Sequence, residues 1–267
     1  VLSRSVRDTA AAIDALAGPD PGCYAWAQPP SRPYLEDVTT APGRLRIAWM
    51  EESMNGLPVD PECISILHDT VQLCQDLGHE LILASPEVDD EAHSAANLTV
   101  WSANLARSID QAAASLGRKI GPDTLESVSL AVYEHGVTVS GADVLAAIDV
   151  YTQTSRSVGR FFEQYDVLLS PVCSVPPAPH GELNQNAPGV SAEQWVKQIF
   201  DYAAFTALQN TTGQPAISLP LGWSADELPV GMQFAGSFAD EATLFRLAGQ
   251  IEEARPWADR HPPLYVG

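Results

Sequence analysis

The sequence has 267 residues, of which 45% are hydrophobic and 18% are charged, and its formal net charge is −20 at pH 7. The 14 basic residues stand against 34 acidic ones, whereas binding to phosphate-rich surfaces requires clustered Lys and Arg side chains that displace counterions. We therefore expect neither nucleic acid nor a membrane as a partner, and no apolar run approaches the length of a membrane span.

The N-terminal part of the chain predicts a helix, a connection and a strand. Apolar residues recur at helical spacing between Val6 and Leu16, after Ser5 as the N-cap. Residues 19–43 are rich in Pro and Gly, which is typical of a long surface connection. Apolar and polar residues then alternate over residues 45–49 with the spacing of a strand.

A second strand is predicted over residues 80–84, and a helix over 61–77 separates it from the strand at 45–49. Strand, helix and strand in this order predict a parallel pair with a crossover helix. Cys63 and Cys74 lie on this helix, and its rise per residue places them too far apart for a disulfide. Thiols of this kind are typical of the reducing cytoplasm, which is the predicted location.

Helical spacing dominates the middle of the chain, from about residue 90 to residue 165. Gly-containing breaks at 117–123 and 136–141 divide this segment, and Ser140 is positioned to cap its last helix. We therefore predict a mainly helical insertion within a single domain.

The C-terminal part returns to strands. A buried strand is predicted at 166–170, a Pro-rich loop at 171–189, and a helix from Ser191 to about Leu208. Two strands and a closing helix at 240–254 follow. Strands that alternate with helices in this way predict the α/β fold class.

The residues themselves offer little for nucleophilic catalysis. No G-x-S-x-G string occurs, and Ser140 and Ser218 fit better as a helix cap and a strand residue. Cys173 is followed by His180 in the same loop, and a thiolate beside an imidazole would be sufficient chemistry. A small apolar side chain that lines a pocket is the favoured interpretation of Cys173.

Metal and cofactor sites have no support in the sequence. The six histidines show no H-x-x-x-H spacing, and the cysteines show no spacing suited to zinc. Gly-rich phosphate loops are absent as well. We expect no metal and no cofactor.

Several segments match, in the right order, the motifs of one known family. They are residues 2–10 (LSRSVRDTA), 45–49 (LRIAW), 166–171 (DVLLSP), 210–234, and 240–244 with 254–257. With these segments the chain resembles the amidase signature family of serine hydrolases over nearly its whole length. The resemblance implies a mixed, twisted central sheet covered by helices on both faces, and hydrolysis of the C–N bond of a small linear or cyclic amide.

The family's chemistry uses a Ser nucleophile, a second Ser held by a cis peptide bond, and a Lys base. In the family these residues precede the segment that 2–10 resembles. The two lysines of this chain, Lys119 and Lys197, lack the strand context of the family's Lys. The resemblance therefore implies that residues 1–267 are the C-terminal portion of a single amidase domain, incomplete at its N-terminal side, with no catalytic residue of its own. Such a chain is expected to be inactive alone, and to associate with the missing N-terminal part or as a homodimer.

The resemblance assigns the chain a role as scaffold and pocket wall. Four residues are expected to line the substrate pocket: Cys173 and Asn210 on the acyl side, and Trp101 and Asn104 on the opposite wall. Gly213 and Gly231 are expected to permit positive φ or close backbone approach. Gln233 is expected to orient neighbouring backbone.

Two other interpretations stay open at this point. The chain can be a self-sufficient binding or scaffold module that kept the fold and lost the chemistry. It can also be an amidotransferase subunit that needs other chains to deliver ammonia, although its acidity disfavours a surface for tRNA.

Overall fold

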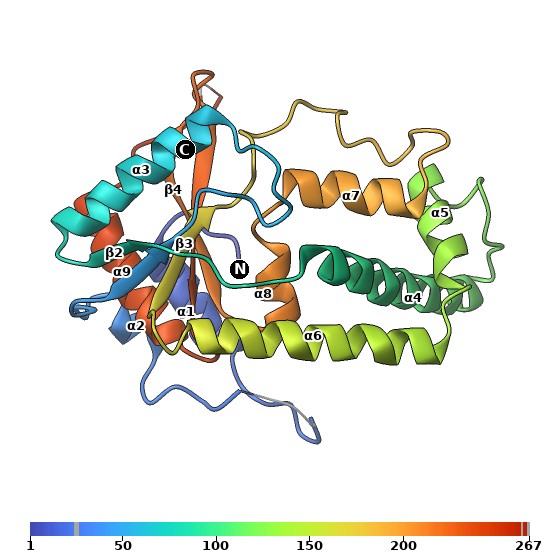
Figure 1. The fold of residues 1–267 in the computed structure, drawn as a ribbon, viewed down its shortest axis with the longest axis horizontal. Helices are drawn as coiled ribbons and strands as arrows, with labels where there is room; N and C mark the ends of the chain where they lie inside the picture. Colours follow the sequence, from blue (N-terminus) through green and yellow to red (C-terminus); the bar gives the residue numbers. More distant parts are fainter. Residues whose placement is uncertain (24–26, 263, 266–267) are drawn as a thin grey trace.

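The computed structural model describes residues 1–23, 27–262 and 264–265, and these residues build a mixed sheet with helices around it (Figure 1). Its strands are β1 (Arg46–Trp49), β2 (Glu80–Leu83), β3 (Val167–Pro171), β4 (Ala216–Trp223) and β5 (Pro229–Gly236). Their order across the sheet is β2-β1-β3-β5-β4. β1 pairs in parallel with β2 and β3, whereas β5 pairs antiparallel with β3 and β4. The predicted parallel pair of β1 and β2 and the mixed α/β sheet are confirmed.

Side chains alternate between the two faces of the sheet, so each face has its own core. Ile47, Val167 and Phe234 lie in the larger core. The helices that contribute to this core are α1 (Val6–Leu16), α2 (Tyr34–Asp37), α3 (Pro61–Asp76) and α9 (Glu241–Ala254). Ala48 and Leu168 point the other way, into a smaller core that the C-terminal end of α6 (Gly141–Phe161) covers. Helices therefore cover both faces, as predicted.

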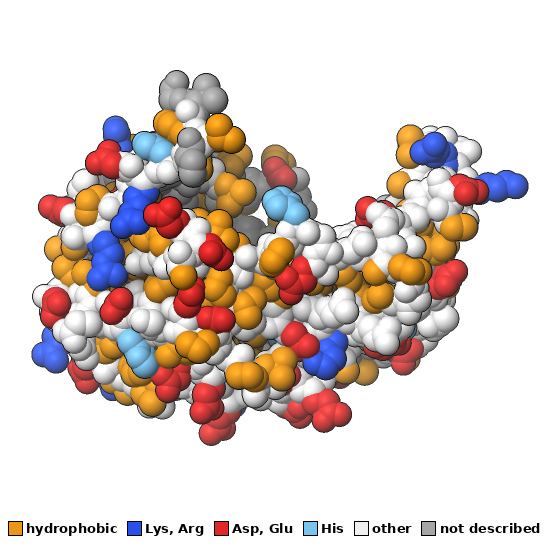
Figure 2. Space-filling view, turned by 90° about the horizontal axis from the view of Figure 1, so that it is seen from above, with side chains coloured by type: hydrophobic (Ala, Val, Ile, Leu, Met, Phe, Trp, Pro, Cys, Tyr) orange, Lys and Arg blue, Asp and Glu red, His pale blue; other side chains and the backbone are white. Residues whose placement is uncertain are grey.

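The segment between β2 and β3 forms a helical arm that extends away from the sheet (Figure 1). It comprises α4 (Asp90–Leu116), α5 (Ser127–Gly136) and α6, and α7 (Ala192–Tyr202) lies alongside it. The breaks between these helices fall where Gly predicts them, and Ser140 caps α6 in a capping box with Asp143. None of the described helices is long and apolar enough to cross a membrane. Acidic side chains are scattered over the face that Figure 2 shows.

The helix predicted from 191 to about 208 is wrong in one respect, because two helices occupy this region. α7 ends at Tyr202, and α8 (Ala207–Thr212) follows after a break. Phe205 lies in the break with an exposed fraction of 2% and packs in the smaller core, which a continuous helix does not allow. The buried Gln233 amide donates to the Phe205 carbonyl oxygen at 3.3 Å. The expected role of Gln233 in orienting backbone is thus confirmed.

The predicted surface connection at 19–43 contains one ordered helix, α2. The Asp14 carboxylate accepts hydrogen bonds from the backbone N–H groups of Tyr34 (2.7 Å) and Leu35 (2.9 Å). These bonds satisfy donors of the first turn, which have no partner within the helix. A cap supplied from another helix leaves no local signature, which explains why the sequence did not predict α2.

Both glycines singled out in the sequence have the expected roles. Gly213 is the C-cap of α8 with φ +74°, a conformation in which glycine avoids steric cost. At Gly231 a Cβ atom would lie 2.7 Å from the Ser218 hydroxyl oxygen. Gly231 therefore permits the close packing of β4 and β5.

Candidate functional site

The sheet topology indicates where a ligand crevice should lie. From β1 the chain crosses to β2 on one side and later returns to β3 on the other side of β1. In open α/β sheets, ligands bind outside the carboxyl ends of the strands at such a switch point. The segment that follows β1 contributes Met54 and Asn55 to a small hollow, and α4, α7 and α8 provide its other walls. We take this hollow as the candidate functional site.

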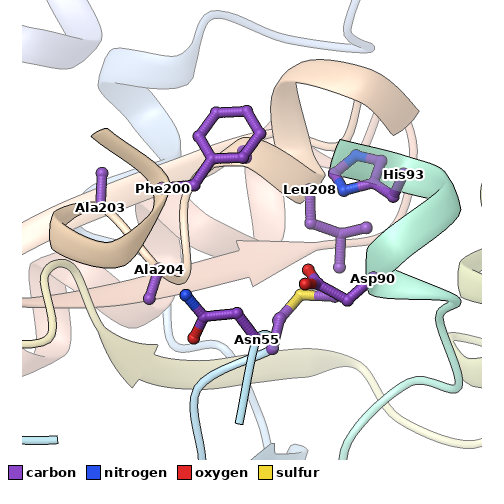
Figure 3. Close-up of a pocket in the computed structure, with 9 residues that line it drawn as sticks. Asn55, Asp90, His93, Phe200, Ala203, Ala204 and Leu208 are labelled. Carbon is purple, nitrogen blue, oxygen red and sulfur yellow. The ribbon is translucent and has the colours of Figure 1, made fainter. Parts of the chain in front are cut away.

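The hollow combines an apolar lining with a few polar groups. Figure 3 shows Asp90 and His93 on the first turn of α4, Asn55 below them, and Phe200 of α7 above the same space. Its volume is about 10 Å³, which is the size of one water molecule. Apolar walls with a few convergent polar groups are typical of one side of a small-molecule pocket.

Hydrogen bonds hold the walls of the hollow together. The Asn55 amide donates to the Asp201 carboxylate at 3.0 Å, and the Ser174 hydroxyl donates to the Asp201 carbonyl oxygen at 2.6 Å. The Ser174 carbonyl oxygen in turn accepts from the Asp60 N–H at 2.7 Å. The segments after β1 and β3 are therefore both fixed to the C-terminal turn of α7.

His93 is the most buried polar group of the hollow, with an exposed fraction of 2%. Its Nε2 lies 2.8 Å from the Thr211 hydroxyl and 3.1 Å from the Asn97 amide nitrogen. Because the amide nitrogen can only donate, Nε2 accepts and the ring proton is on Nδ1. The Asn97 oxygen accepts from the Tyr151 hydroxyl at 2.9 Å. A neutral imidazole thus links α4, α6 and α8, and burial lowers the pKa of His93 although the Asp90 charge opposes this shift.

The pKa of the Asp90 carboxyl group is shifted in the opposite direction to that of His93. Burial raises the pKa of its carboxyl group, with smaller increases from Asp89 and Asp201 and an opposing effect of His93. Partly buried groups with shifted pKa values occur preferentially at functional sites. Asp90 and His93 can form hydrogen bonds with a polar ligand, as donors or as acceptors. Neither group is a nucleophile activated by a base.

A pH series should reveal the buried imidazole. A His with a lowered pKa in the folded state stays neutral while the unfolded chain takes up a proton below its pKa of about 6.5. Stability is therefore lost as the pH falls through 6.5. Between pH 7.5 and 5.5 we expect the wild type to lose more of its unfolding free energy than His93→Gln, by no more than about 1.4 kcal/mol.

Urea unfolding at both pH values measures this difference. The raised pKa of Asp90 acts in the opposite direction, but it is present in both proteins and largely cancels. His180→Gln, at an exposed position, is the control and should keep the pH dependence of the wild type. Identical pH dependence in wild type and His93→Gln would contradict the assignment of a neutral His93.

Cys173 contacts Tyr202 of α7, is not among the residues that line the hollow, and does not have the surroundings of a nucleophile. It follows β3, is half-buried, and is hydrogen-bonded to the Tyr202 hydroxyl. Burial raises the pKa of its thiol, and the Tyr202 bond offsets this only in part. His180 is exposed, and no hydrogen bond joins it to Cys173 in the described residues. A neutral thiol fits a pocket wall better than a Cys–His nucleophile.

The other three predicted pocket residues divide into two groups. Trp101 of α4 packs edge-to-face on Phe200, with ring centroids 5.6 Å apart, and is 40% exposed. The structure thus brings Trp101 and Cys173 to the C-terminal turn of α7. Asn104 and Asn210 are exposed, and none of the four predicted residues is among those that line the hollow. A pocket role for all four residues stays a prediction.

Sequence reasoning missed the polar residues of the hollow itself. Asp90 and His93 lie three positions apart at the start of the helix that follows a parallel strand, and this placement was a usable signal. Asn55 and Phe200 gave no local signal, since they meet only through the tertiary fold.

The two lysines lie outside the sheet, as predicted. Lys119 lies between α4 and α5, and Lys197 is on α7, where it pairs with the Asp201 carboxylate at 2.7 Å. Ser140 caps a helix and Ser218 lies in β4. Among the described residues, no hydrogen bond joins Lys119 or Lys197 to the hydroxyl group of Ser140 or Ser218.

Comparison with known proteins identifies the family. A sequence model described as Amidase matches residues 1–245. The chain belongs to the amidase signature family. Because this match extends from the first residue through β5 and into α9, it covers the sheet and the helical arm together.

Curated relatives of this amidase-family chain are about twice as long. It is 32% identical over 271 residues to the 6-aminohexanoate-cyclic-dimer hydrolases of Pseudomonas sp. (strain NK87) and Paenarthrobacter ureafaciens, covering 99% of this chain and 55% of each relative. It is 35% identical over 261 residues to the putative amidase AmiC of Mycobacterium leprae (strain TN), covering 97% of this chain and 53% of that protein. The chain spans about half the length of these relatives.

Solved structures give the same result. A 6-aminohexanoate cyclic dimer hydrolase complexed with substrate superposes with a TM-score of 0.91 at 31% identity, over 98% of this chain and 55% of that one. A bacterial aryl acylamidase superposes with a TM-score of 0.78 at 19% identity, over 97% and 55% of the two chains, which supports the fold alone. The sheet and arm of this amidase-family chain are therefore those of part of an amidase.

Proposed function

We propose that this chain is the C-terminal portion of a serine amidase that hydrolyses the C–N bond of a small linear or cyclic amide. One observation carries the proposal. Nearly the whole of this chain matches about half the length of enzymes named 6-aminohexanoate-cyclic-dimer hydrolase. The Ser nucleophile, the second Ser on a cis peptide bond and the Lys base belong, in this proposal, to polypeptide outside these residues.

The chemistry of amide hydrolysis indicates which steps the residues outside this chain perform and what this chain contributes. The Ser oxygen adds to the amide carbonyl, and neutral Lys takes its proton through the bridging Ser hydroxyl. The proton passes to the leaving amine, and water then releases the acid from the acyl-enzyme. This chain contributes the wall formed by Phe200, Trp101 and the Asp90–His93 pair, which holds the substrate beside the reacting groups.

The reaction needs no cofactor, and the predicted cytoplasmic location suits the buried thiols of Cys63 and Cys74.

A fluorophosphonate probe, read out by intact mass, tests the proposal. We expect no mass shift on the 28.6 kDa chain alone, and one probe adduct on the complete enzyme together with amide hydrolysis. A shift on the chain alone would place a reactive Ser within these residues and overturn the division of labour. If the complete enzyme forms no probe adduct and hydrolyses no amide, a binding or scaffold module would be favoured instead.

Substrate preference should depend on the two predicted wall residues that contact α7. In the complete enzyme, the double variant Trp101→Ala and Cys173→Ala should change the ratio of kcat/KM between a short and a long acyl amide by about tenfold, because altered apolar walls discriminate poorly between acyl lengths. Leu116→Ala is the matched control, since Leu116 is exposed at the far end of α4. An unchanged ratio would remove both residues from the pocket.

A further inference from the structure

The Asp90 carboxylate is the one charged side chain, among the described residues, that lines the hollow between α4, α7 and α8. It points from the first turn of α4 into this space (Figure 3). No hydrogen bond or ion pair to the carboxylate occurs in the part of the chain that the structure describes. A partly buried charge without a partner carries a desolvation cost that a ligand of opposite charge can offset.

The other two polar side chains of the lining already have partners. The Asn55 amide nitrogen donates to the Asp201 carboxylate at 3.0 Å, and its oxygen accepts from the Ser53 hydroxyl at 2.8 Å. His93 Nε2 lies 3.1 Å from the Asn97 amide nitrogen, and burial lowers the pKa of His93, which favours the neutral ring. The lining therefore supplies no cation to the carboxylate.

The charges around the carboxylate are negative as well. Burial is the largest cause of the raised pKa of Asp90, and the negative charges of Asp89 and Asp201 raise it further. Lys197 is the cation on the neighbouring turn of α7, and it is bound to Asp201 at 2.7 Å. The hollow therefore has a negative potential, which favours a positively charged ligand.

The walls and the size of the hollow suit a small organic cation. Phe200 lines the hollow and packs edge-to-face on Trp101, with ring centroids 5.6 Å apart. Aromatic rings attract ammonium groups, most strongly where water is excluded. The volume of about 10 Å³ accepts one group of the size of a water molecule. A primary ammonium head is a compact charge of that size with three hydrogen-bond donors.

Two other kinds of cation fit the hollow less well. A guanidinium group is a broad plane that presents its N–H donors as a fork, and it needs more room than one water molecule occupies. A divalent metal ion requires several oxygen or nitrogen ligands, whereas no group of three or more metal-binding side chains exists among the described residues. The lining offers a single carboxylate, which matches a single ammonium head.

We propose that Asp90 binds a primary ammonium group of the substrate, with Phe200 as the aromatic wall, and that this amidase selects amides with such a group away from the scissile bond. The inference rests on the proposed function and deepens it, because it names the substrate class that the wall selects. The ammonium head enters the hollow, and the alkyl chain behind it leads to the reacting groups of the complete enzyme. A neutral substrate of the same shape leaves the carboxylate without a partner and loses affinity.

Matched amide substrates test this selectivity in the complete enzyme. One series has a terminal ammonium on the acyl portion and a second has it on the amine portion, each over several chain lengths. Every compound has a terminal methyl analogue of the same shape and a terminal hydroxyl analogue, which donates a hydrogen bond without charge. The assay is run at about pH 8, where a primary amine is protonated.

In at least one series, we expect kcat/KM for the best ammonium substrate to exceed that of both analogues by at least about tenfold. Equal kcat/KM for the ammonium and methyl compounds in both series would overturn the proposal. A hydroxyl analogue as good as the ammonium compound would overturn it as well, because the site would then recognise a donor and not a charge.

Two variants at adjacent positions locate the charge that is recognised. Asp90→Asn keeps the shape of the side chain, and it should reduce the ratio of ammonium to methyl kcat/KM to less than about threefold. Asp89→Asn is the matched control, because it removes a neighbouring charge outside the lining. Asp89 caps α4 by accepting from the Ala92 N–H at 3.0 Å, and Asn caps equally well. This control should keep the ratio within about twofold of the wild type, and equal effects of both variants would contradict the assignment to Asp90.

A binding measurement distinguishes this inference from the proposed function. Calorimetric titration of n-butylammonium and of n-butanol into the complete enzyme reports binding without turnover. Selective binding of the ammonium that Asp90→Asn abolishes, without hydrolysis of any amide, would keep the ammonium site and reject the amidase activity. Hydrolysis without any ammonium preference would do the reverse. If the wild type shows no preference and Asp90→Asn lowers the Tm of the complete enzyme, the partner of Asp90 is a cation from the rest of the domain, and the proposed ligand is wrong.

Discussion

Replacement of Phe234 by alanine should lower the free energy of unfolding by about 4 kcal/mol. The Phe234 side chain is 1% exposed and lies in the interior strand β5, in register with Leu169 of β3 and Ile217 of β4. Phe234 and Leu169 belong to the larger core, and the partly buried Ile217 packs against it. Removal of the ring costs its burial energy and leaves a cavity where strands fixed by ladder hydrogen bonds cannot close in.

Urea or thermal unfolding measures this loss. Phe238→Ala is the control, because Phe238 follows the same strand but is 67% exposed. We expect the control to change stability by less than about 1 kcal/mol. A loss for Phe234→Ala no larger than that of the control would mean that the core between β5 and α9 is packed differently.

Asp37→Ala should destabilise the protein by about 3 kcal/mol. The Asp37 side chain is 1% exposed, and its carboxylate accepts hydrogen bonds from Arg32 and, at 2.7 Å, from Nε of Arg246. It thereby joins α2 to α9. Truncation leaves two guanidinium groups without their anion, and this loss exceeds the small value of an exposed ion pair.

Two further variants define the cause. Asp37→Asn retains the shape but not the charge, and it should lose at least half as much stability as Asp37→Ala if the charge dominates. Glu36→Ala changes the exposed neighbour on the same short helix and should stay within about 0.5 kcal/mol of the wild type. Chemical unfolding of the three variants provides the comparison, and a neutral effect of Asp37→Ala would contradict the bridging role.

The sequence predicts those parts of the fold whose cause is local. Alternating apolar residues predicted β1, and Gly predicted the breaks between the helices of the arm, because these signals act on neighbouring φ and ψ angles. The break between α7 and α8 was missed because its cause is the burial of Phe205 beneath a sheet formed by distant residues. The cap of α2 was missed for a similar reason, since Asp14 belongs to another helix.

The candidate site was less predictable than the fold. Cys173 and Trp101 both contact α7, but neither lines the hollow, and their pocket role stays a prediction. Asn55 and His93 come from segments separated by β2 and α3, and only the switch point of the sheet brings them to one hollow. Family resemblance indicates which enzyme the chain is related to, but spacing along the chain does not reveal contacts that three separate segments create.

The position of the arm also affects how the chain reaches its native state. β1 and β3 are direct neighbours, and the Arg46 N–H donates to the Asp166 carboxylate across 120 positions. Closing a loop of that length costs about 4 kcal/mol of chain entropy before the pair gains any contact. The helices of the arm pack mainly against one another, so they can form early and shorten this loop, and pulsed hydrogen exchange should protect α4 and α6 before β3. Protection in that order would mean that the arm that extends the molecule also sets the order in which its sheet is assembled.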